Sequence, residues 1–179
     1  MKLLKNIMAA IMLTTTTISL IGCGVKTEET IIKGEAPVVD RRVLLVFNDV
    51  RERADSTFTD IILVTLNGDQ SVIRHDLKGR KMYINERALG LPNEQLAYLF
   101  ASSFAMFSDP AKNIQGTQRA KDYADFYALL MMDEMRVNIT SAVAVLLTPL
   151  FTNDPDAKKR YEMVMAKAKQ VDMLQGWKD

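Results

Sequence analysis

The chain has 179 residues, with 23 Lys and Arg, 22 Asp and Glu, one His and one Cys, and 48% of its residues are hydrophobic. This length and apolar content fit one globular domain with a hydrophobic core and exclude an intrinsically disordered chain. The net charge of +1 disfavours a nucleic-acid binder, the single thiol excludes an internal disulfide, and the single imidazole excludes a zinc site with two histidine ligands.

The first 22 residues have the features of a bacterial signal peptide. Lys2 and Lys5 form a basic start, and residues 7–21 are largely apolar but too short, and too interrupted by threonines, to span a membrane. Residues 20–23 resemble a lipobox, in which a small residue precedes the modified cysteine. The sequence therefore predicts cleavage before Cys23 and attachment of diacylglycerol to its thiol.

The lipid on Cys23 is expected to anchor the mature chain to a membrane, because more than one acyl chain gives stable binding. Glycine rather than aspartate follows the cysteine, as in lipoproteins sorted to the outer membrane, so we expect the periplasmic face of that membrane in a bacterial cell envelope. The chain thus divides into a signal peptide at residues 1–22, a lipidated flexible tether at residues 23–37 and a folded domain at residues 38–179.

The first half of the domain combines one helix with short strands. Val39, Val43, Phe47 and Val50 recur at helical spacing and predict an amphipathic helix over residues 38–53. The arginines of this helix, which are expected in solvent, are Arg41, Arg42, Arg51 and Arg53. Runs rich in β-branched and aromatic residues predict strands at residues 61–66, 71–75 and 81–85, with a turn after the first of them.

The second half is predicted to be helical. A helix begins at residue 93, with Asn93 as its cap, and carries a broad apolar face to Phe107. A loop at residues 109–116 leads to a helix at residues 117–136, a shorter helix at residues 141–147 and a last helix from residue 153 to about residue 174. The sequence therefore predicts an α+β, mainly helical fold with a small sheet packed on the helices.

Four segments, in order along the chain, are similar to parts of one enzyme family. The segment similar to an edge strand before an active-site helix comprises Lys81, Met82, Tyr83, Ile84 and Asn85. Residues 93–99 are similar to the approach to an H-E-x-x-H motif, Ala124 and Asp125 to the end of an E-x-x-A-D element, and Asp154 with Pro155 to a His-Pro pair. Over residues 38–170 the chain thus resembles the gluzincin metallopeptidases of the HtpX, BepA and LoiP type, which implies a zincin-like domain.

The resemblance places a zinc site where this chain lacks the residues to build one. In the family two histidines and a later glutamate bind zinc, and another glutamate polarises the bound water. Those positions are occupied here by Ser102, Ser103, Met106 and Lys121. Hydroxyls, a thioether and an ammonium are poor zinc ligands, so no metal or other cofactor is expected.

Asp125 is retained, at a position that in the family supports the histidine ligands. Two interpretations remain open for it. Lys121, four residues earlier on the same helix, pairs with Asp125 and fills part of the vacated metal position, or it is solvated while Asp125 caps a helix or bonds a loop.

The missing ligands favour an envelope lipoprotein with a non-catalytic, metallopeptidase-like domain that acts in binding or protein quality control. Its expected partners are unfolded or outer-membrane protein segments, which add as a strand along residues 81–85. The alternative is an active envelope hydrolase of the same family with an unrecognised site. A serine–lysine dyad of Ser102 or Ser103 with Lys121 is one form of it, although no strained nucleophile turn surrounds either serine.

Other chemistry-bearing residues have simpler interpretations. His75 is expected in a surface turn. The clustered methionines, expected to fill the core, are Met131, Met132, Met135, Met163 and Met165. The basic residues expected on a solvated helix face are Lys158, Lys159, Arg160, Lys167 and Lys169.

Overall fold

The computed structural model describes residues 35–67, 71–114 and 116–170. The predicted signal peptide, the lipidation site at Cys23, most of the tether and the last predicted residues of the final helix lie outside the described residues. Across the described ranges, no helix combines the length and the apolar character that a membrane span requires.

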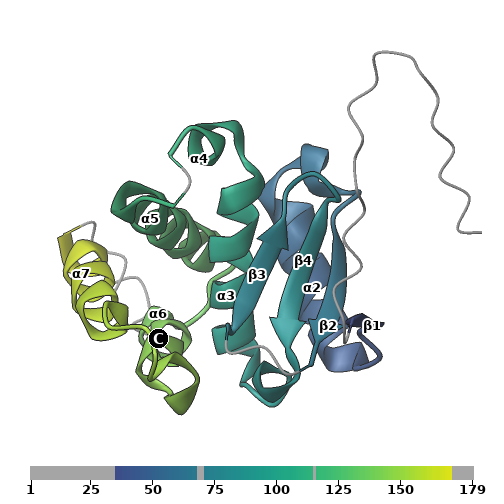
Figure 1. Ribbon diagram of the computed structural model, residues 1–179. Helices are drawn as coiled ribbons and strands as arrows, with labels where there is room; N and C mark the ends of the chain where they lie inside the picture. Colours follow the sequence, from purple (N-terminus) through teal and green to yellow (C-terminus); the bar gives the residue numbers. More distant parts are fainter. Residues whose placement is uncertain (1–34, 68–70, 115, 171–179) are drawn as a thin grey trace, which may run out of the picture. The chain divides into compact units, whose positions relative to one another are not determined.

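The described residues form an α+β fold that is mainly helical, as the sequence predicted (Figure 1). The strands are β1 (Glu35–Pro37), β2 (Ile62–Leu66), β3 (Ile73–Asp76) and β4 (Lys81–Asn85). The α-helices are α2 (Arg41–Ala54), α3 (Asn93–Phe107), α4 (Asp109–Lys112), α5 (Gln118–Glu134), α6 (Ile139–Val143) and α7 (Ala157–Gln170). Short 3-10 helices are η1 (Ser56–Phe58), η2 (Glu86–Ala88), η3 (Ala144–Leu147) and η4 (Pro149–Phe151).

The sheet has the strand order β1-β2-β4-β3, in which β2 and β4 run parallel and the two outer strands run antiparallel to their neighbours. The prediction that residues 81–85 form an edge strand is therefore wrong, because β4 pairs with β2 on one side and with β3 on the other. A tight turn joins β3 to β4, and Asp76 accepts hydrogen bonds from two backbone N–H groups of that turn. Strand β3 lies beside α3 at the edge of the sheet, so among the described residues no strand pairs with its outer side (Figure 1).

Helix α2 begins where the sequence supplies a cap. The side chain of Asp40 accepts hydrogen bonds from the backbone N–H groups of Arg42 and Val43, so the helix starts after Val39, which is 88% exposed. The sequence predicted that the guanidinium of Arg42 lies in solvent. It is instead partly buried, and it donates to the carbonyl of Leu91 (2.8 Å) and to the side chain of Asn93 (2.9 Å). Asn93 therefore anchors the entry to α3 on α2 instead of capping its own helix.

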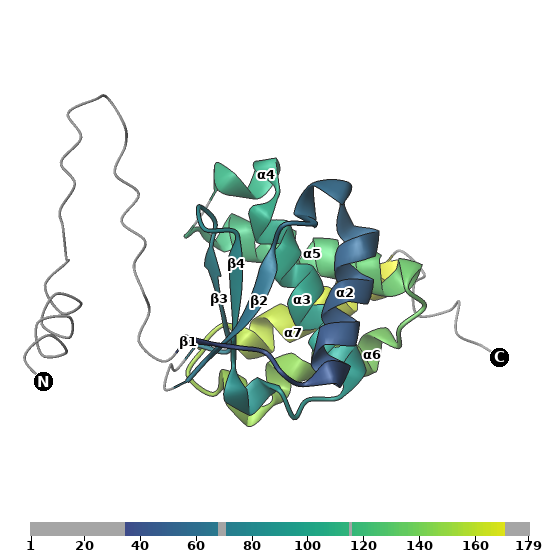
Figure 2. The same cartoon turned by 90° about the vertical axis from the view of Figure 1, so that its right-hand side faces the viewer.

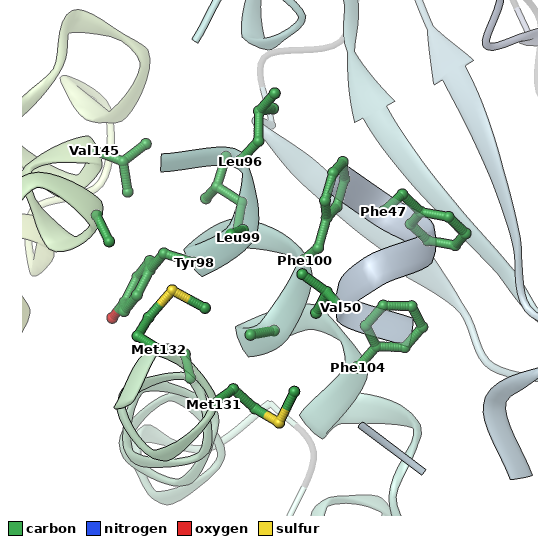
Figure 3. Close-up of a cluster of buried hydrophobic side chains, with 14 of the residues drawn as sticks. Phe47, Val50, Leu96, Tyr98, Leu99, Phe100, Phe104, Met131, Met132 and Val145 are labelled. Atoms are coloured by element: carbon green, nitrogen blue, oxygen red, sulfur yellow. The ribbon is translucent and has the colours of Figure 1, made fainter. Parts of the chain in front are cut away.

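The core lies between the sheet and the helices, which gather on one side of it (Figure 2). Phe47 of α2 packs against Phe100 and Phe104 of α3, with ring centroids 5.4 and 5.3 Å apart. Figure 3 shows these rings on one side of α3 and the side chains of Tyr98 and Met132 on the other. Helix α3 thus fills the centre of the domain, as its broad apolar face predicted.

Several predicted boundaries differ from the structure. The end of the predicted tether forms β1, which pairs with β2, so the folded domain begins before residue 38. The predicted loop at residues 109–116 contains α4, and the predicted helix at residues 141–147 is divided into α6 and the 3-10 helix η3. Helix α7 begins at Ala157, which leaves Asp154 and Pro155 in the preceding segment. Met131 and Met132 are buried in the core as predicted, whereas Met163 is 38% exposed.

Candidate functional site

A hollow of about 350 Å³ lies between β3 and α3, and we call it the α3–β3 cleft. Its walls come from β3, from one face of α3, from the start of α5 and from the segment that leads into α7. The four positions at which the resemblance predicts a lost metal site all line it, namely Ser102, Ser103, Met106 and Lys121. Residues far apart in the sequence are therefore brought together in one cleft.

The two serines differ in their hydrogen bonding. The hydroxyl of Ser102 donates to the carbonyl of Leu99 on its own helix (3.0 Å). Ser103 is only 1% exposed, and its hydroxyl has no hydrogen-bond partner in the described part of the chain. Neither hydroxyl bonds the ammonium of Lys121, so the structure does not assemble a serine–lysine dyad from these residues.

Lys121 pairs with aspartates of the segment before α7. Its Nζ lies 3.2 Å from an oxygen of Asp156 and 3.8 Å from an oxygen of Asp154. The interpretation that Lys121 pairs with Asp125 is therefore wrong, whereas the alternative of a solvated lysine agrees with its exposure. The side chain of Lys121 is 44% exposed, so these ion pairs contribute little to stability by themselves.

Asp125 is instead bound by an arginine and a tyrosine. Arg160 of α7 donates from Nε and from a terminal nitrogen to the two oxygens of Asp125, at 2.8 and 2.7 Å, and the hydroxyl of Tyr98 donates to the same carboxylate at 2.8 Å. The third nitrogen of Arg160 donates to Asp154 at 3.1 Å. Asp125 thus holds α3, α5 and α7 together from behind the cleft, and it lines the neighbouring hollow between α5 and α7.

The prediction that Arg160 lies on a solvated helix face is wrong, because its side chain is only 13% exposed. Burial lowers the pKa of Arg160, but the hydrogen bonds and the charge of Asp125 outweigh burial and hold the pKa above its ordinary value. Burial, and then the negative charge of Asp125, raise the pKa of Tyr98 well above its usual range, so its hydroxyl remains a donor. Nothing in the local sequence distinguishes Arg160, which is buried, from the lysines beside it, which are in solvent.

The side chains of the cleft do not fit a divalent metal ion. The hydroxyl of Ser102 is engaged by its own helix, Met106 offers a thioether, and Lys121 contributes a cation, which repels a metal ion. In residues 35–67, 71–114 and 116–170, no three His, Cys, Asp or Glu side chains gather in a way that could hold a metal. The aspartates near the cleft are engaged by Lys121 and Arg160.

His75 lies in β3 and lines the cleft, which corrects the prediction of a surface turn. Its ring meets Phe107 edge-on at 5.7 Å between centroids, and its Nε2 atom is buried without a hydrogen-bond partner among the described residues. Burial lowers the pKa of His75 from 6.5 to about 4. The imidazole is therefore neutral at pH 7.

This shift predicts a loss of stability in mild acid. His75 is the only histidine of the chain, and the unfolded imidazole takes up a proton as the pH falls below 6.5 while the folded one does not. The free energy of unfolding should fall by about 1–2 kcal/mol between pH 6.5 and pH 5. Urea unfolding across this range checks the value. The variant His75→Gln should show a nearly flat profile, and an equal acid-induced loss in that variant would contradict the assignment.

The outer side of β3 carries backbone groups that pair with no other strand of the described residues. Val72 stands opposite Asn85 in the register of the β3–β4 ladder, and the Asn85 N–H donates directly to the Val72 carbonyl (3.0 Å). Along an antiparallel ladder, residue pairs that exchange backbone hydrogen bonds alternate with pairs that do not. Val72 and Asn85 form a bonded pair, so Ile73 and His75 fall in the other class, and their backbone N–H and C=O groups point away from β4. Both residues also line the cleft, which therefore has an open strand edge along one wall.

No known protein family, curated protein or solved structure matches this chain.

Proposed function

We propose that the protein is a lipoprotein of the bacterial cell envelope, anchored through Cys23, whose domain has a metallopeptidase-like scaffold and binds protein segments without cleaving them. The lipid holds the domain at the periplasmic face of the outer membrane, where unfolded or outer-membrane protein segments are its partners. The domain then acts in protein quality control as a binding module rather than as an enzyme.

The observation that carries this proposal is the meeting of two features in the α3–β3 cleft. The positions of the absent zinc ligands lie on the walls formed by α3 and α5, and the open edge of β3 lies on another wall. An extended segment can pair with the outward backbone groups of Ile73 and His75, which supplies affinity without any catalytic group. The binding edge is thus β3 rather than residues 81–85.

The absence of activated groups at the same wall supports binding without hydrolysis. Peptide hydrolysis needs an activated nucleophile or a polarised water. Ser102 is bonded to its helix, and Lys121 is paired with two aspartates. The alternative, an active hydrolase of the same family, requires a catalytic group elsewhere in the chain and predicts cleavage of a bound segment.

The test measures binding of extended peptides to the full-length lipidated protein in detergent micelles. Fluorescein-labelled ten-residue peptides that tile the strands of an outer-membrane β-barrel protein are titrated by fluorescence anisotropy. We expect saturable binding by a subset of them, and the bound peptides should remain intact in mass spectra. Cleaved peptides would support the hydrolase, and no saturable binding by any peptide would refute the proposal.

A matched pair of variants locates the binding edge. His75→Pro removes an outward N–H and leaves the pairing with β4 in place, so it should weaken binding about tenfold through the lost hydrogen bond and steric conflict. His75→Ala also removes the imidazole but keeps the N–H, and it should retain most of the affinity. Equal binding by His75→Pro and by the unchanged protein would exclude strand addition at β3.

A further inference from the structure

The hollow between α5 and α7 has a volume of about 400 Å³, and we call it the α5–α7 hollow. The apolar side chains of its lining are Phe126, Leu129, Met163, Val164 and Ala166. Two of them remain partly open to solvent, since Phe126 is 40% and Met163 is 38% exposed. An apolar group that covered this lining would remove it from water and stabilise the fold.

The polar groups of the hollow already have partners. Asp122 accepts a hydrogen bond from Gln118 (2.8 Å), and the carboxylate of Asp125 is held by Arg160. The ammonium of Lys167 lies over an aromatic ring of the lining, 5.7 Å from its centroid. A charged group that entered would lose hydration without gaining a free counter-charge, so the hollow favours an apolar occupant.

The chain continues beyond α7 from the hollow itself. Gln170, the last residue of α7, belongs to the lining, so residues 171–179, which lie outside the described residues, begin at the hollow. The apolar residues of this C-terminal tail are Val171, Met173, Leu174 and Trp177. The stretch from Gln170 to Trp177 can extend about 23 Å, whereas α7 between Met163 and Gln170 is only about 10 Å long. Trp177 is therefore within reach of the whole hollow.

We infer that the C-terminal tail, residues 171–179, covers the α5–α7 hollow, with the indole of Trp177 as its apolar anchor. A segment joined to the rim has an effective concentration in the millimolar range, which a separate partner would have to overcome. The indole N–H needs an acceptor when it is buried, and the carboxylate of Asp122 has acceptor capacity beyond its bond from Gln118. The covered hollow fastens α7 to α5 beside Asp125.

The tail can be observed directly, because Trp177 is the only tryptophan of the chain. Emission spectra and acrylamide quenching are recorded for the full-length lipidated protein in detergent micelles, in buffer and in urea. Burial of a large apolar side chain favours the docked state by about tenfold or more. Trp177 should therefore emit at a shorter wavelength in buffer than in urea, and its quenching constant should be several times lower.

A matched pair of variants assigns this burial to the hollow. Met163→Glu places a carboxylate in the lining, where it must stay hydrated, and should raise the quenching constant most of the way to that of the unfolded chain. Leu45→Glu makes a similar change at a residue of α2 that is 60% exposed and lies outside the lining, and it should leave the constant unchanged. Met163→Leu keeps the site apolar and should preserve the burial. If Met163→Glu fails to fold, Ala166→Glu brings the same charge to an exposed position of the lining.

Other sites and other occupants give different results. Equal quenching of Trp177 in buffer and in urea would leave the hollow to a separate partner and overturn the inference. Burial that survives the glutamate substitution in a folded variant lies elsewhere, for example in the detergent micelle, and also overturns it. Burial that is lost on dilution at constant detergent concentration would place the tail in the hollow of a second copy rather than in its own.

Discussion

Replacing Asp125 by alanine is expected to lower the free energy of unfolding by about 3–5 kcal/mol, because the change leaves a buried guanidinium without its counter-charge. Asp125 accepts two hydrogen bonds from Arg160 and one from Tyr98, and it is 1% exposed. Urea unfolding monitored by circular dichroism measures the loss. Such a cost is a large part of the stability of a typical domain, so the variant should be populated in its unfolded form at moderate temperature.

Two controls distinguish the buried ion pair from a general effect of substitution on α5. Asp122→Ala, on the same helix, loses only an exposed hydrogen bond from Gln118 and should cost no more than about 0.5 kcal/mol. Joint replacement of Asp125 by leucine and Arg160 by methionine removes both charges and should recover most of the stability. If the double variant is as unstable as Asp125→Ala, the unpaired guanidinium is not the cause.

Replacing Phe104 by alanine is expected to cost about 3–5 kcal/mol, because it opens a cavity at the centre of the core. The ring of Phe104 is fully buried, and its centroid lies 5.3 Å from that of Phe47 and 5.6 Å from that of Phe58. It thus joins α3 to α2 and to the 3-10 helix η1 that follows α2. Calorimetry or urea unfolding measures the cost.

Phe126→Ala is the matched control, because the same atoms are removed from a side chain that is 40% exposed. The ring of Phe126 lies on α5 under the ammonium of Lys167, at 5.7 Å from its centroid. Its removal should cost about 1 kcal/mol or less, because less apolar surface is buried by this ring and no enclosed cavity is left behind. Equal costs for the two variants would contradict the central position of Phe104.

The secondary structure could be predicted largely from the sequence, because hydrophobic periodicity and caps are local signals. Residues 81–85 form a strand with the predicted bounds, and α2, α3 and α5 each end within a few residues of their predictions. Periodicity also places Ser102, Ser103 and Met106 on neighbouring positions of one helix, so their presence on one wall of the cleft follows from the sequence once α3 is assigned. That this wall is a lost metal site remains a proposal.

The pairing of strands could not be predicted in the same way. Residues 35–37 carry too short a pattern to indicate a strand, and they form one only because β2 offers its edge. The strand at residues 81–85 looks the same whether it lies inside a sheet or at its edge, and the β3–β4 turn together with the parallel β2 pairing places it inside. Strand order depends on contacts between distant segments, which local propensity does not report.

The sequence by itself determined which residues are available: one imidazole, two adjacent serines and a methionine on one helix, and an aspartate on a later one. Only the tertiary structure decided the partners of the charged groups. Arg160 lies 35 residues from Asp125, and a charged residue on a polar helix face has the same local pattern whether it meets water or a buried carboxylate. The packing of α7 against α5 brings the two side chains together and buries them, and a charge buried without a partner would be costly.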